Sequence, residues 1–199
     1  MTRALILASA SKSRAAMLRA AGVAVEIVPA HADEDAVKDA LKADGATAAD
    51  CATALAELKA VQVSQRYAEI LVIGADQMLE CEGRWFDKPK DLEGARGHLT
   101  AMRGKTHVLP TAVAVALNGA VIWRHVASPR LTMRPFSDAF IGQYLALAGN
   151  AVTTSVGAYQ LEGPGAQLFS RIDGDFFTIL GLPLLDLLAF LREHEVVPR

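Results

Sequence analysis

A short aliphatic run that leads directly into Gly74-Ala75-Asp76-Gln77 restricts the fold of this chain more than any other feature. The run, Ile70–Ile73, is rich in β-branched residues and predicts a buried strand. A strand that ends at Gly74 would present Asp76 at the mouth of a sheet, which is where open α/β folds bind their ligands. The sequence therefore predicts an α/β fold with Asp76 in a ligand site.

Lys88 is the second charged residue that we expect at this mouth, because Asp87-Lys88-Pro89 follows a predicted hairpin at 80–84. A carboxylate and an ammonium together suit a polyphosphate ester with a divalent metal, since the acid holds the metal or activates water and the lysine neutralises phosphate charge. The alternative is a capping aspartate and a solvated lysine.

The N-terminal segment has a similar pattern. The apolar run Ala4–Ala8 predicts a strand, Ser9–Arg14 follows it, and the next residues read as a helix that ends at Gly22. Ser11 is the expected N-cap, and the free N–H groups of a first helical turn form an anion site. Three hydroxyls and two cations in six residues favour phosphate binding, although a simple capped helix is the alternative. The segment is not a P-loop, because its glycines are absent.

Further along, the chain predicts βα units first and a long hairpin afterwards. Helices are expected over 48–66, over 92–102 with Asp91 as its cap, from Ser137 to about 149, and after Pro183. Asn118-Gly119 predicts a hairpin between the strands 108–117 and 120–133. The remaining expectations are a strand near 23–28, an acidic loop at 33–35 in which Asp35 could cap a helix, and a turn between strands at Gly174-Asp175.

Composition limits the class of protein. The 199 residues are 52% hydrophobic and carry a formal net charge of −2, so a sizeable core is expected and a nucleic-acid-binding surface is not. No apolar segment approaches the roughly 20 residues of a membrane span, and the N-terminal run is shorter than a signal peptide's apolar region. Cys51 and Cys81 lack metal-ligand spacing, which favours a reducing compartment, so we expect a cytoplasmic protein.

Taken together, these segments resemble the Maf family of nucleoside triphosphate pyrophosphatases from Leu5 to Leu191. One departure from the family pattern is Lys12-Ser13, where members often have Pro-Arg, and this change puts fine specificity in doubt. The matching pieces are Leu7 to Arg14, Asp33-Glu34, Leu55-Ala56 with Lys59-Ala60, Gly74 to Gln77, Lys88-Pro89, Met102 to His107, Gly157 to Gly163 and Gly181 to Leu184.

The resemblance implies a single domain over 1–199: an elongated mixed β-sheet flanked by helices, with two lobes around a central cleft. It also implies hydrolysis of a nucleoside triphosphate to the monophosphate and pyrophosphate by water attack on the α-phosphorus, with Mg²⁺ or Mn²⁺. Among relatives, homodimers are common. The implied roles are Asp76 for water activation, Glu34 and Asp76 for the metal, Lys59, Lys88 and Arg14 for phosphate charge, and Ser9 and Ser11 as phosphate donors.

Base selectivity is assigned to Gln77 and Glu162, with Ser13 as a further specificity position. Pyrimidine-preferring members of the family tend to have Thr and Gln at the positions of Gln77 and Glu162, whereas members that act on 7-methyl-GTP tend to have Gln and Glu. The chemistry agrees, because a carboxylate accepts from both adjacent donors of guanine, and N7 methylation makes the ring cationic. His107, at the start of a strand, is interpreted as structural.

Three alternatives stay open at this point. The chain could be a dTTP or UTP pyrophosphatase, a nucleotide-binding regulator of septum formation, or a sugar-nucleotide transferase. The regulator does not require Asp76 to be chemically competent, and the transferase would need an acceptor site that the sequence does not reveal. The leading hypothesis is an enzyme that removes non-standard nucleotides from the pool.

Overall fold

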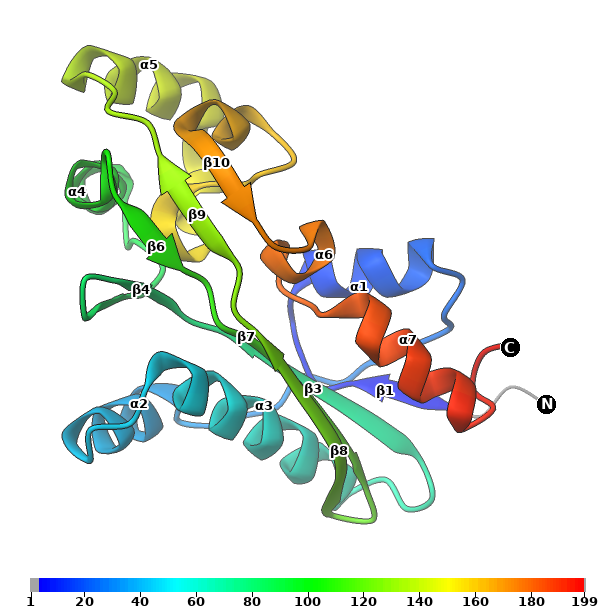
Figure 1. The fold of residues 1–199 in the computed structure, drawn as a ribbon. Helices are drawn as coiled ribbons and strands as arrows, with labels where there is room; N and C mark the ends of the chain where they lie inside the picture. Colours follow the sequence, from blue (N-terminus) through cyan, green and yellow to red (C-terminus); the bar gives the residue numbers. More distant parts are fainter. Residues whose placement is uncertain (1–3, 199) are drawn as a thin grey trace. The chain divides into compact units, whose positions relative to one another are not determined.

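The chain forms two compact units in the computed structural model, which describes residues 4–198 (Figure 1). The first unit comprises the described parts of Met1–Gln77, Thr111–Ala127 and Asp175–Arg199, and the second comprises Met78–Pro110 and Ser128–Gly174. Each unit contains a five-stranded sheet with helices, so the α/β class is confirmed. The expectation of one elongated sheet is wrong, because the strands divide into two sheets. The expected single domain with a cleft stays a prediction.

A mixed sheet with the strand order β2-β1-β3-β7-β8 organises the first unit. β1 runs parallel to β2 and β3, whereas β3, β7 and β8 are antiparallel neighbours. The strands are β1 (Leu5–Leu7), β2 (Glu26–Ile27), β3 (Leu71–Gln77), β7 (Thr111–Leu117) and β8 (Ala120–Ala127). The helices are α1 (Lys12–Ala20), α2 (Glu34–Ala43), α3 (Ala48–Ser64), α6 (Phe176–Ile179) and α7 (Leu184–Glu193).

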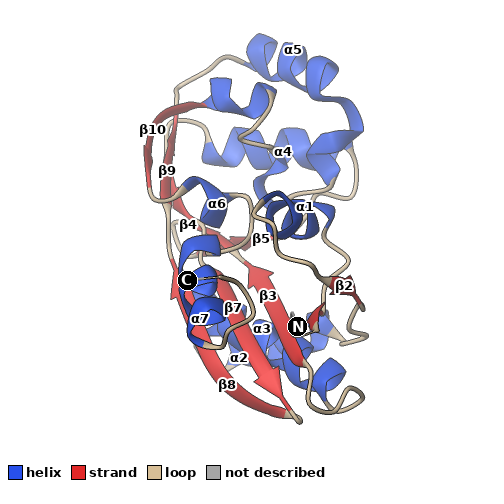
Figure 2. Cartoon of the chain, turned by 90° about the vertical axis from the view of Figure 1, so that its right-hand side faces the viewer, coloured by secondary structure: helices blue, strands red, loops and turns tan. Residues whose placement is uncertain are grey.

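Helices cover both faces of this sheet, as Figure 2 shows, and the alternation of side chains along β3 separates two apolar layers. Ile73 and Ala75 belong to the main core, which they share with buried residues of α1 and α7. Val72 lies on the opposite face, in a smaller cluster with Val63 of α3. Consecutive residues near the end of β3 therefore point toward different helices.

Helix α3 packs closely on the sheet at Gly74. A Cβ atom at this position would lie 2.1 Å from the carbonyl oxygen of Ala56 and 2.6 Å from the amide nitrogen of Ala60. Backbone contacts this short leave room only for glycine, so the small residues of α3 and Gly74 together allow the helix to lie directly on β3. The contact brings the side chains that follow Ala56 on α3 next to the end of the strand.

The expected end of this strand is corrected by the structure. β3 does not stop at Gly74 but continues to Gln77, because β7 pairs with it throughout, with Asp76 opposite Ala112 and Gln77 opposite Thr111. The predicted position of Asp76 beyond the strand is therefore wrong. Asp76 is the last residue but one of β3, so its backbone is fixed by the ladder hydrogen bonds.

An antiparallel sheet with the order β10-β9-β6-β4-β5 forms the second unit. The predicted hairpin at 80–84 is confirmed, since β4 and β5 pair around Glu82 and Gly83, which both have positive φ. The strands are β4 (Leu79–Cys81), β5 (Arg84–Phe86), β6 (Thr106–Val108), β9 (Arg130–Met133) and β10 (Phe169–Asp173). The helices are α4 (Leu92–Met102) and α5 (Asp138–Ala148), with short 3₁₀ turns η1 (Gly149–Thr153), η2 (Val156–Ala158) and η3 (Pro164–Leu168).

The long hairpin predicted around Asn118-Gly119 is correct at its turn and wrong at its length. Each of the two runs is divided between the sheets, since 106–108 and 130–133 belong to the second unit and 111–117 and 120–127 to the first. The interruptions contain Pro110 and Pro129, which lack the N–H that a continuous ladder requires.

Several helix starts were predicted at the right residue. Ser11, Asp91 and Ser137 each accept a hydrogen bond from the backbone N–H three residues later, as N-caps do. Two expectations are wrong. The acidic segment 33–35 is the start of α2, with Asp33 rather than Asp35 as its cap. Gly174-Asp175 joins a strand to a helix, because the Asp175 carboxylate caps α6.

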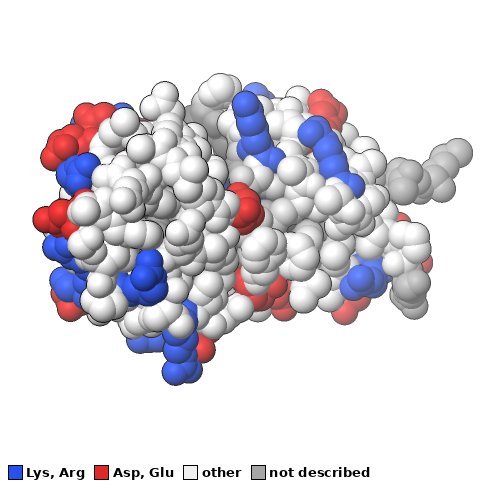
Figure 3. Space-filling view, turned by 90° about the horizontal axis from the view of Figure 1, so that it is seen from above, with Lys and Arg blue, Asp and Glu red and all other residues white. Residues whose placement is uncertain are grey.

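Lysine, arginine and acidic side chains are interspersed on the face shown in Figure 3, with uncharged residues between them. This mixture differs from the clustered basic stripe of a typical nucleic-acid-binding face. Among the described residues, none of the helices combines the length and the apolar character that crossing a lipid bilayer demands.

Candidate active site

A lysine between two carboxylates is the centre of the candidate site. Lys59 Nζ lies 2.6 Å from Asp76 Oδ1 and 2.9 Å from Glu34 Oε1. The side chains of Lys59 and Asp76 are 9% and 10% exposed, and that of Glu34 is 41% exposed. The cluster is therefore buried at Asp76 and opens to solvent at Glu34. The structure brings together three residues that were assigned to the site from the sequence.

Two tertiary contacts put these side chains in place. The close packing of α3 on Gly74 sets Lys59 beside Asp76, two residues further along β3. Glu34 opens α2, and the loop before it is held to α3 by Gln62. The Gln62 side chain donates to the carbonyl oxygen of His31 at 3.0 Å and accepts from its N–H at 2.8 Å. Sequence reasoning missed Gln62, because a half-buried glutamine within a helix carries no signal for a partner 31 residues away.

The turn between β1 and α1 lies next to this cluster. The Ser9 hydroxyl oxygen accepts hydrogen bonds from the Ser11 N–H and from Arg14, each at 3.2 Å. With both lone pairs engaged, the Ser9 hydroxyl has its proton left to donate. The N–H groups of Lys12 and Ser13 precede the first intrahelical hydrogen bond of α1, and such groups favour an anion.

Arg14 connects this turn to two other parts of the first unit. Its Nε donates to the carbonyl oxygen of Gly181 at 2.7 Å, and one terminal nitrogen donates to the carbonyl oxygen of Ala75 at 2.9 Å. Burial lowers the pKa of the guanidinium from its usual value, an effect that the nearby Asp76 and Glu34 carboxylates oppose. Arg14 stays charged, and most of its donors are engaged by the protein.

Gln77, the predicted specificity residue, lies on the face of the sheet opposite to Asp76. Its amide nitrogen donates to the carbonyl oxygens of Thr178 and Ile179, each at 3.1 Å, and to the Thr111 hydroxyl at 2.9 Å. The side chain thus ties the end of β3 to the end of α6.

Lys88 and Glu162 belong to the second unit, and both side chains are exposed. Ser11 and Ser13 lie in the first unit, where the Ser11 hydroxyl caps α1 and Ser13 is exposed. The structure thus brings together Glu34, Lys59 and Asp76 with Ser9, Ser11 and Arg14. The participation of Lys88 and Glu162 in the same site stays a prediction.

The segment 157–163, which carries Glu162, is anchored in the second unit by aromatic side chains. His107 is fully buried, and its Nε2 lies 2.8 Å from the hydroxyl of Tyr159. Tyr144 donates to the carbonyl oxygen of Ala158 at 2.9 Å. Burial lowers the pKa of His107 to about 4 and raises that of Tyr144 to about 12. His107 is a neutral core residue, as the sequence suggested.

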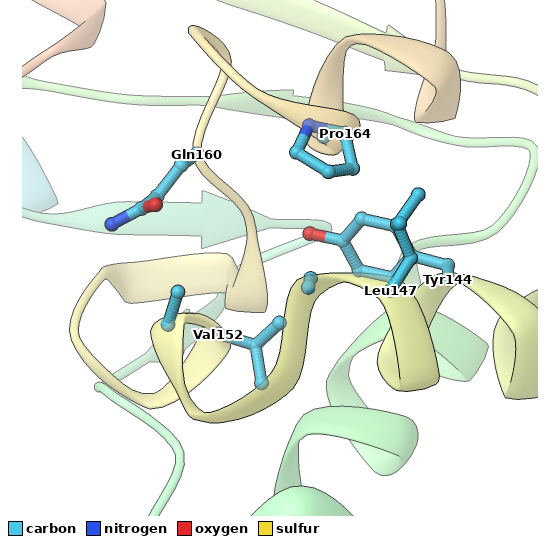
Figure 4. Close-up of a pocket in the computed structure, with 8 residues that line it drawn as sticks. Tyr144, Leu147, Val152, Gln160 and Pro164 are labelled. Carbon is cyan, nitrogen blue, oxygen red and sulfur yellow. The ribbon is translucent and has the colours of Figure 1, made fainter.

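A pocket of about 110 Å³ lies beside this segment (Figure 4). Tyr144 and Leu147 of α5, Val152 of η1 and Pro164 of η3 supply most of its wall, and Gln160 supplies an amide. The pocket contains none of the residues that the sequence assigned to the site. It is mainly apolar, which does not suit a triphosphate.

The donor set fits a divalent cation. The carboxylates of Glu34 and Asp76 converge on one point, since a single ammonium contacts both. Mg²⁺ is commonly held by one or two carboxylates, with water and substrate phosphates as its other ligands. No group of three or more His, Cys, Asp or Glu side chains with metal-binding geometry occurs within residues 4–198, so most ligands would come from water and substrate.

An anion-binding turn next to a carboxylate–lysine cluster, on the end of an α/β sheet, defines a class of protein that acts on phosphate esters. Comparison with known proteins identifies the family. Residues 4–194 match the family described as Maf-like protein, and the chain belongs to this family.

Curated relatives match the chain over almost its whole length. A protein of Granulibacter bethesdensis named nucleoside triphosphate pyrophosphatase is 55% identical over 97% of this chain and 98% of its own. One of Paramagnetospirillum magneticum with the same name is 56% identical over 97% of this chain and 100% of its own. A protein of Rhizobium meliloti named 7-methyl-GTP pyrophosphatase is 51% identical over 95% of both chains.

Proposed function

We propose that this chain hydrolyses nucleoside triphosphates to the monophosphate and pyrophosphate, with 7-methyl-GTP as the preferred substrate. The observation that carries the proposal is the Glu34–Lys59–Asp76 cluster beside the Ser9–Arg14 turn, in a chain of the Maf family. The relatives named nucleoside triphosphate pyrophosphatase and 7-methyl-GTP pyrophosphatase support the same reaction class.

In this proposal, each part of the site has one task. The Ser9 hydroxyl and the N–H groups that open α1 bind phosphate oxygens, and Arg14 fixes the shape of that turn through its three protein contacts. Asp76 accepts the proton of the water that attacks the α-phosphorus. Lys59 offsets the charge that develops on the phosphate oxygens.

A divalent cation, Mg²⁺ or Mn²⁺, is the proposed cofactor, and Glu34 and Asp76 would hold it. When bound, it would neutralise charge on the triphosphate and polarise the attacked phosphorus. Lys59 already holds the two carboxylates close together, so little rearrangement of the protein backbone would be needed. We place the protein in the cytoplasm, where two buried cysteine thiols are compatible with the redox conditions.

Base preference rests on Gln77 and Glu162. A carboxylate at position 162 would accept from the two adjacent donors of guanine, and the fixed positive charge of the methylated base would strengthen that pairing. The Glu162→Gln substitution should therefore reduce discrimination in favour of 7-methyl-GTP over GTP by about 10-fold or more, because a charge-assisted hydrogen bond contributes roughly 1.5–3 kcal/mol.

A pyrophosphate-release screen tests the proposal. Purified protein is assayed with 7-methyl-GTP, GTP, dTTP and UTP, each with Mg²⁺, with Mn²⁺ and with a chelator. The highest kcat/KM is expected for 7-methyl-GTP in the presence of metal. A higher value for dTTP or UTP would overturn the base preference alone. Nucleotide binding without turnover of any triphosphate would contradict the enzyme proposal and favour a nucleotide-binding regulator.

A further inference from the structure

Helix α2 carries Glu34 into the candidate site with little apolar packing of its own. The helix lies against α3 (Figure 1), but none of its ten residues is buried, and its apolar face consists of half-buried side chains such as Val37 and Leu41. Elements with few buried apolar contacts open at low free energy. The position of Glu34 is therefore set largely by contacts other than the apolar face of α2.

The segment that leads into α2 is attached to the rest of the first unit at two successive points. At the first, Val28 packs on the small apolar cluster that contains Val63 of α3. At the second, three residues later, the Gln62 side chain binds the backbone of His31. Glu34 follows His31 by three residues, so this second attachment is the nearer of the two.

The Gln62 amide binds the backbone of His31 from both of its ends. Its Nε2 donates to the His31 carbonyl oxygen at 3.0 Å, and its Oε1 accepts from the His31 N–H at 2.8 Å. The two bonds together set both the distance and the rotation of the backbone at this residue. The amide cannot be reversed, because its oxygen would then face the His31 carbonyl oxygen.

Gln62 and Lys59 lie on the same side of α3, since they are three residues apart in the helix. Lys59 binds the Glu34 carboxylate directly at 2.9 Å, whereas Gln62 binds the backbone that precedes it. In the proposed reaction the Lys59 ammonium turns to the phosphate oxygens, so its hold on Glu34 weakens when the substrate binds. The contact between Gln62 and His31 involves no charged group and does not change with that charge.

We infer that Gln62 is the positioning residue for Glu34, and that it keeps this carboxylate beside Asp76 when a triphosphate draws the Lys59 ammonium away. The inference rests on the proposed function, since it takes Glu34 as a metal ligand. Gln62 acts through the backbone of residues 31–34. Lys59 and Asp76 are brought together by the packing of α3 on β3, so they keep their places when Gln62 is replaced.

Variants of the full chain separate this role from a general loss of stability. Gln62→Met removes both hydrogen bonds. Gln62→Glu keeps the shape of the side chain and the acceptor for the His31 N–H, but sets a carboxylate oxygen against the His31 carbonyl. Gln65→Met is the matched control, because Gln65 is an exposed glutamine three residues further along, at the C-cap of α3.

Two measurements are made on each protein. Hydrogen–deuterium exchange is followed without nucleotide, and pyrophosphate release from 7-methyl-GTP and from GTP is followed over a range of Mn²⁺ concentrations. In Gln62→Met, the amides of residues 31–37 should exchange about 5-fold faster or more, while those of β3 keep their protection. The Mn²⁺ concentration that gives the half-maximal rate should rise by about 5- to 100-fold, the range expected for two lost hydrogen bonds.

The control and the conservative variant sharpen this result. Gln65→Met should match the wild-type protein in both measurements, and Gln62→Glu should follow Gln62→Met. A role of Gln62 in stability alone would speed exchange throughout the first unit and lower the rate equally at every Mn²⁺ concentration. That result would contradict the inference.

A double-mutant cycle with Glu34→Gln identifies the residue through which Gln62 acts. Because the carboxylate at position 34 is then already absent, adding Gln62→Met should change the half-maximal Mn²⁺ concentration by no more than about 2-fold. The same large effect of Gln62→Met with and without Glu34 would overturn the inference.

Unchanged exchange over residues 31–37 would overturn it as well, in Gln62→Met or, if that protein does not fold, in Gln62→Glu. This measurement needs neither substrate nor metal. Pyrophosphate release from no triphosphate would therefore overturn the proposed function, whereas the exchange result would still decide whether Gln62 holds the segment that carries Glu34.

Discussion

At the scale of single residues, Asp76 is the position on which the proposed chemistry depends most. Its carboxylate is 10% exposed at the side chain and pairs with Lys59, so it is oriented before any substrate binds. An amide in its place cannot accept the proton of the attacking water.

The Asp76→Asn variant should therefore lose more than nine-tenths of kcat, a loss above ~1.4 kcal/mol in transition-state stabilisation, while it keeps a cooperative unfolding transition. Steady-state pyrophosphate release measures the effect. Asp39→Asn, on the exposed face of α2, is the control and should behave like wild type. An Asp76→Asn protein that retained more than a tenth of kcat would show that Asp76 is not the central group.

Lys59 leads to a prediction about metal binding in the absence of nucleotide. Its ammonium is the counterion of both Glu34 and Asp76, and a cation placed between the carboxylates must work against that positive charge. At an effective dielectric constant of 20, unit charges 4 Å apart interact by about 4 kcal/mol.

Lys59→Met should therefore bind Mn²⁺ about tenfold more tightly than wild type, or more, and Mn²⁺ should raise its unfolding temperature further. Isothermal titration calorimetry measures the affinity for Mn²⁺. Thermal unfolding with and without Mn²⁺ measures the rise in unfolding temperature. Lys90→Met, at an exposed lysine, should leave both unchanged. Weaker Mn²⁺ binding by Lys59→Met would contradict the assignment of Glu34 and Asp76 as metal ligands.

At the scale of elements, the packing of α3 on β3 positions the site, and Gly74 makes that packing possible. A methyl group at position 74 would meet the backbone of Ala56 at 2.1 Å, and a helix backbone cannot yield as a flexible side chain does. Overpacking of a core costs 1–3 kcal/mol and occasionally more.

We expect Gly74→Ala to lower the free energy of unfolding by about 3 kcal/mol or more, and to reduce turnover because Lys59 moves away from Asp76. Gly97→Ala is the control: this glycine lies within α4 with nothing within 4 Å of an added Cβ, so alanine should stabilise by about 1 kcal/mol. Denaturant unfolding compares the two. Equal stability of Gly74→Ala and wild type would contradict the close packing.

Arg14 connects three segments of the first unit, and a lysine cannot reproduce its planar set of donors. Arg14→Lys keeps the positive charge but cannot reach Gly181, Ala75 and Ser9 at once. We expect a loss of about 2–3 kcal/mol in unfolding free energy together with a higher KM for triphosphates. A higher KM at unchanged stability would show that Arg14 serves the substrate rather than the turn.

The elements that the sequence predicted correctly are those set by local chemistry. Ser11, Asp91 and Ser137 cap their helices through contacts three residues away, and Asn118-Gly119 forms its hairpin turn because both residues tolerate positive φ. The errors concern features set by partners distant in the chain. β3 extends past Gly74 only because β7 pairs with it there.

In the candidate site, too, the features set by local chemistry were predictable and those set by distant partners were not. The Ser-rich turn was predictable from the hydroxyls and cations at the start of a helix. The grouping of Lys59 with Asp76 and Glu34 came from family resemblance, because no local pattern places a lysine of α3 against a strand. The contact of Gln62 with His31 and that of Gln77 with α6 could not be predicted, since each depends on the packing of separate elements.

At the scale of the whole molecule, the chain passes between two units, each with its own sheet and one tryptophan. Trp123 lies on β8 in the first unit and stacks on Phe190, with ring centroids 5.0 Å apart, and Trp85 lies on β5 in the second. The two indoles can therefore report the unfolding of the two units separately, in Trp123→Phe and Trp85→Phe proteins.

The second unit should lose stability in mild acid because of His107. Burial lowers the pKa of this imidazole to about 4, whereas an unfolded chain binds the proton near pH 6.5. Protons bound by the unfolded state alone oppose folding, so the stabilisation is complete above pH 6.5 and is lost as the pH falls toward 4. The full loss amounts to about 3 kcal/mol, at 1.36 kcal/mol for each pKa unit.

Urea unfolding of Trp123→Phe, followed through Trp85 at pH 7.5, 6, 5 and 4, measures this loss. Adding His107→Gln should lower stability at pH 7.5, because the ring contacts with Tyr159 and Phe169 are lost, but should flatten the decline below pH 6.5. The carboxylates that also titrate in this range are common to both proteins, so they cancel in the difference. An equally steep decline with and without His107 would show that the buried imidazole does not set the acid sensitivity of the second unit.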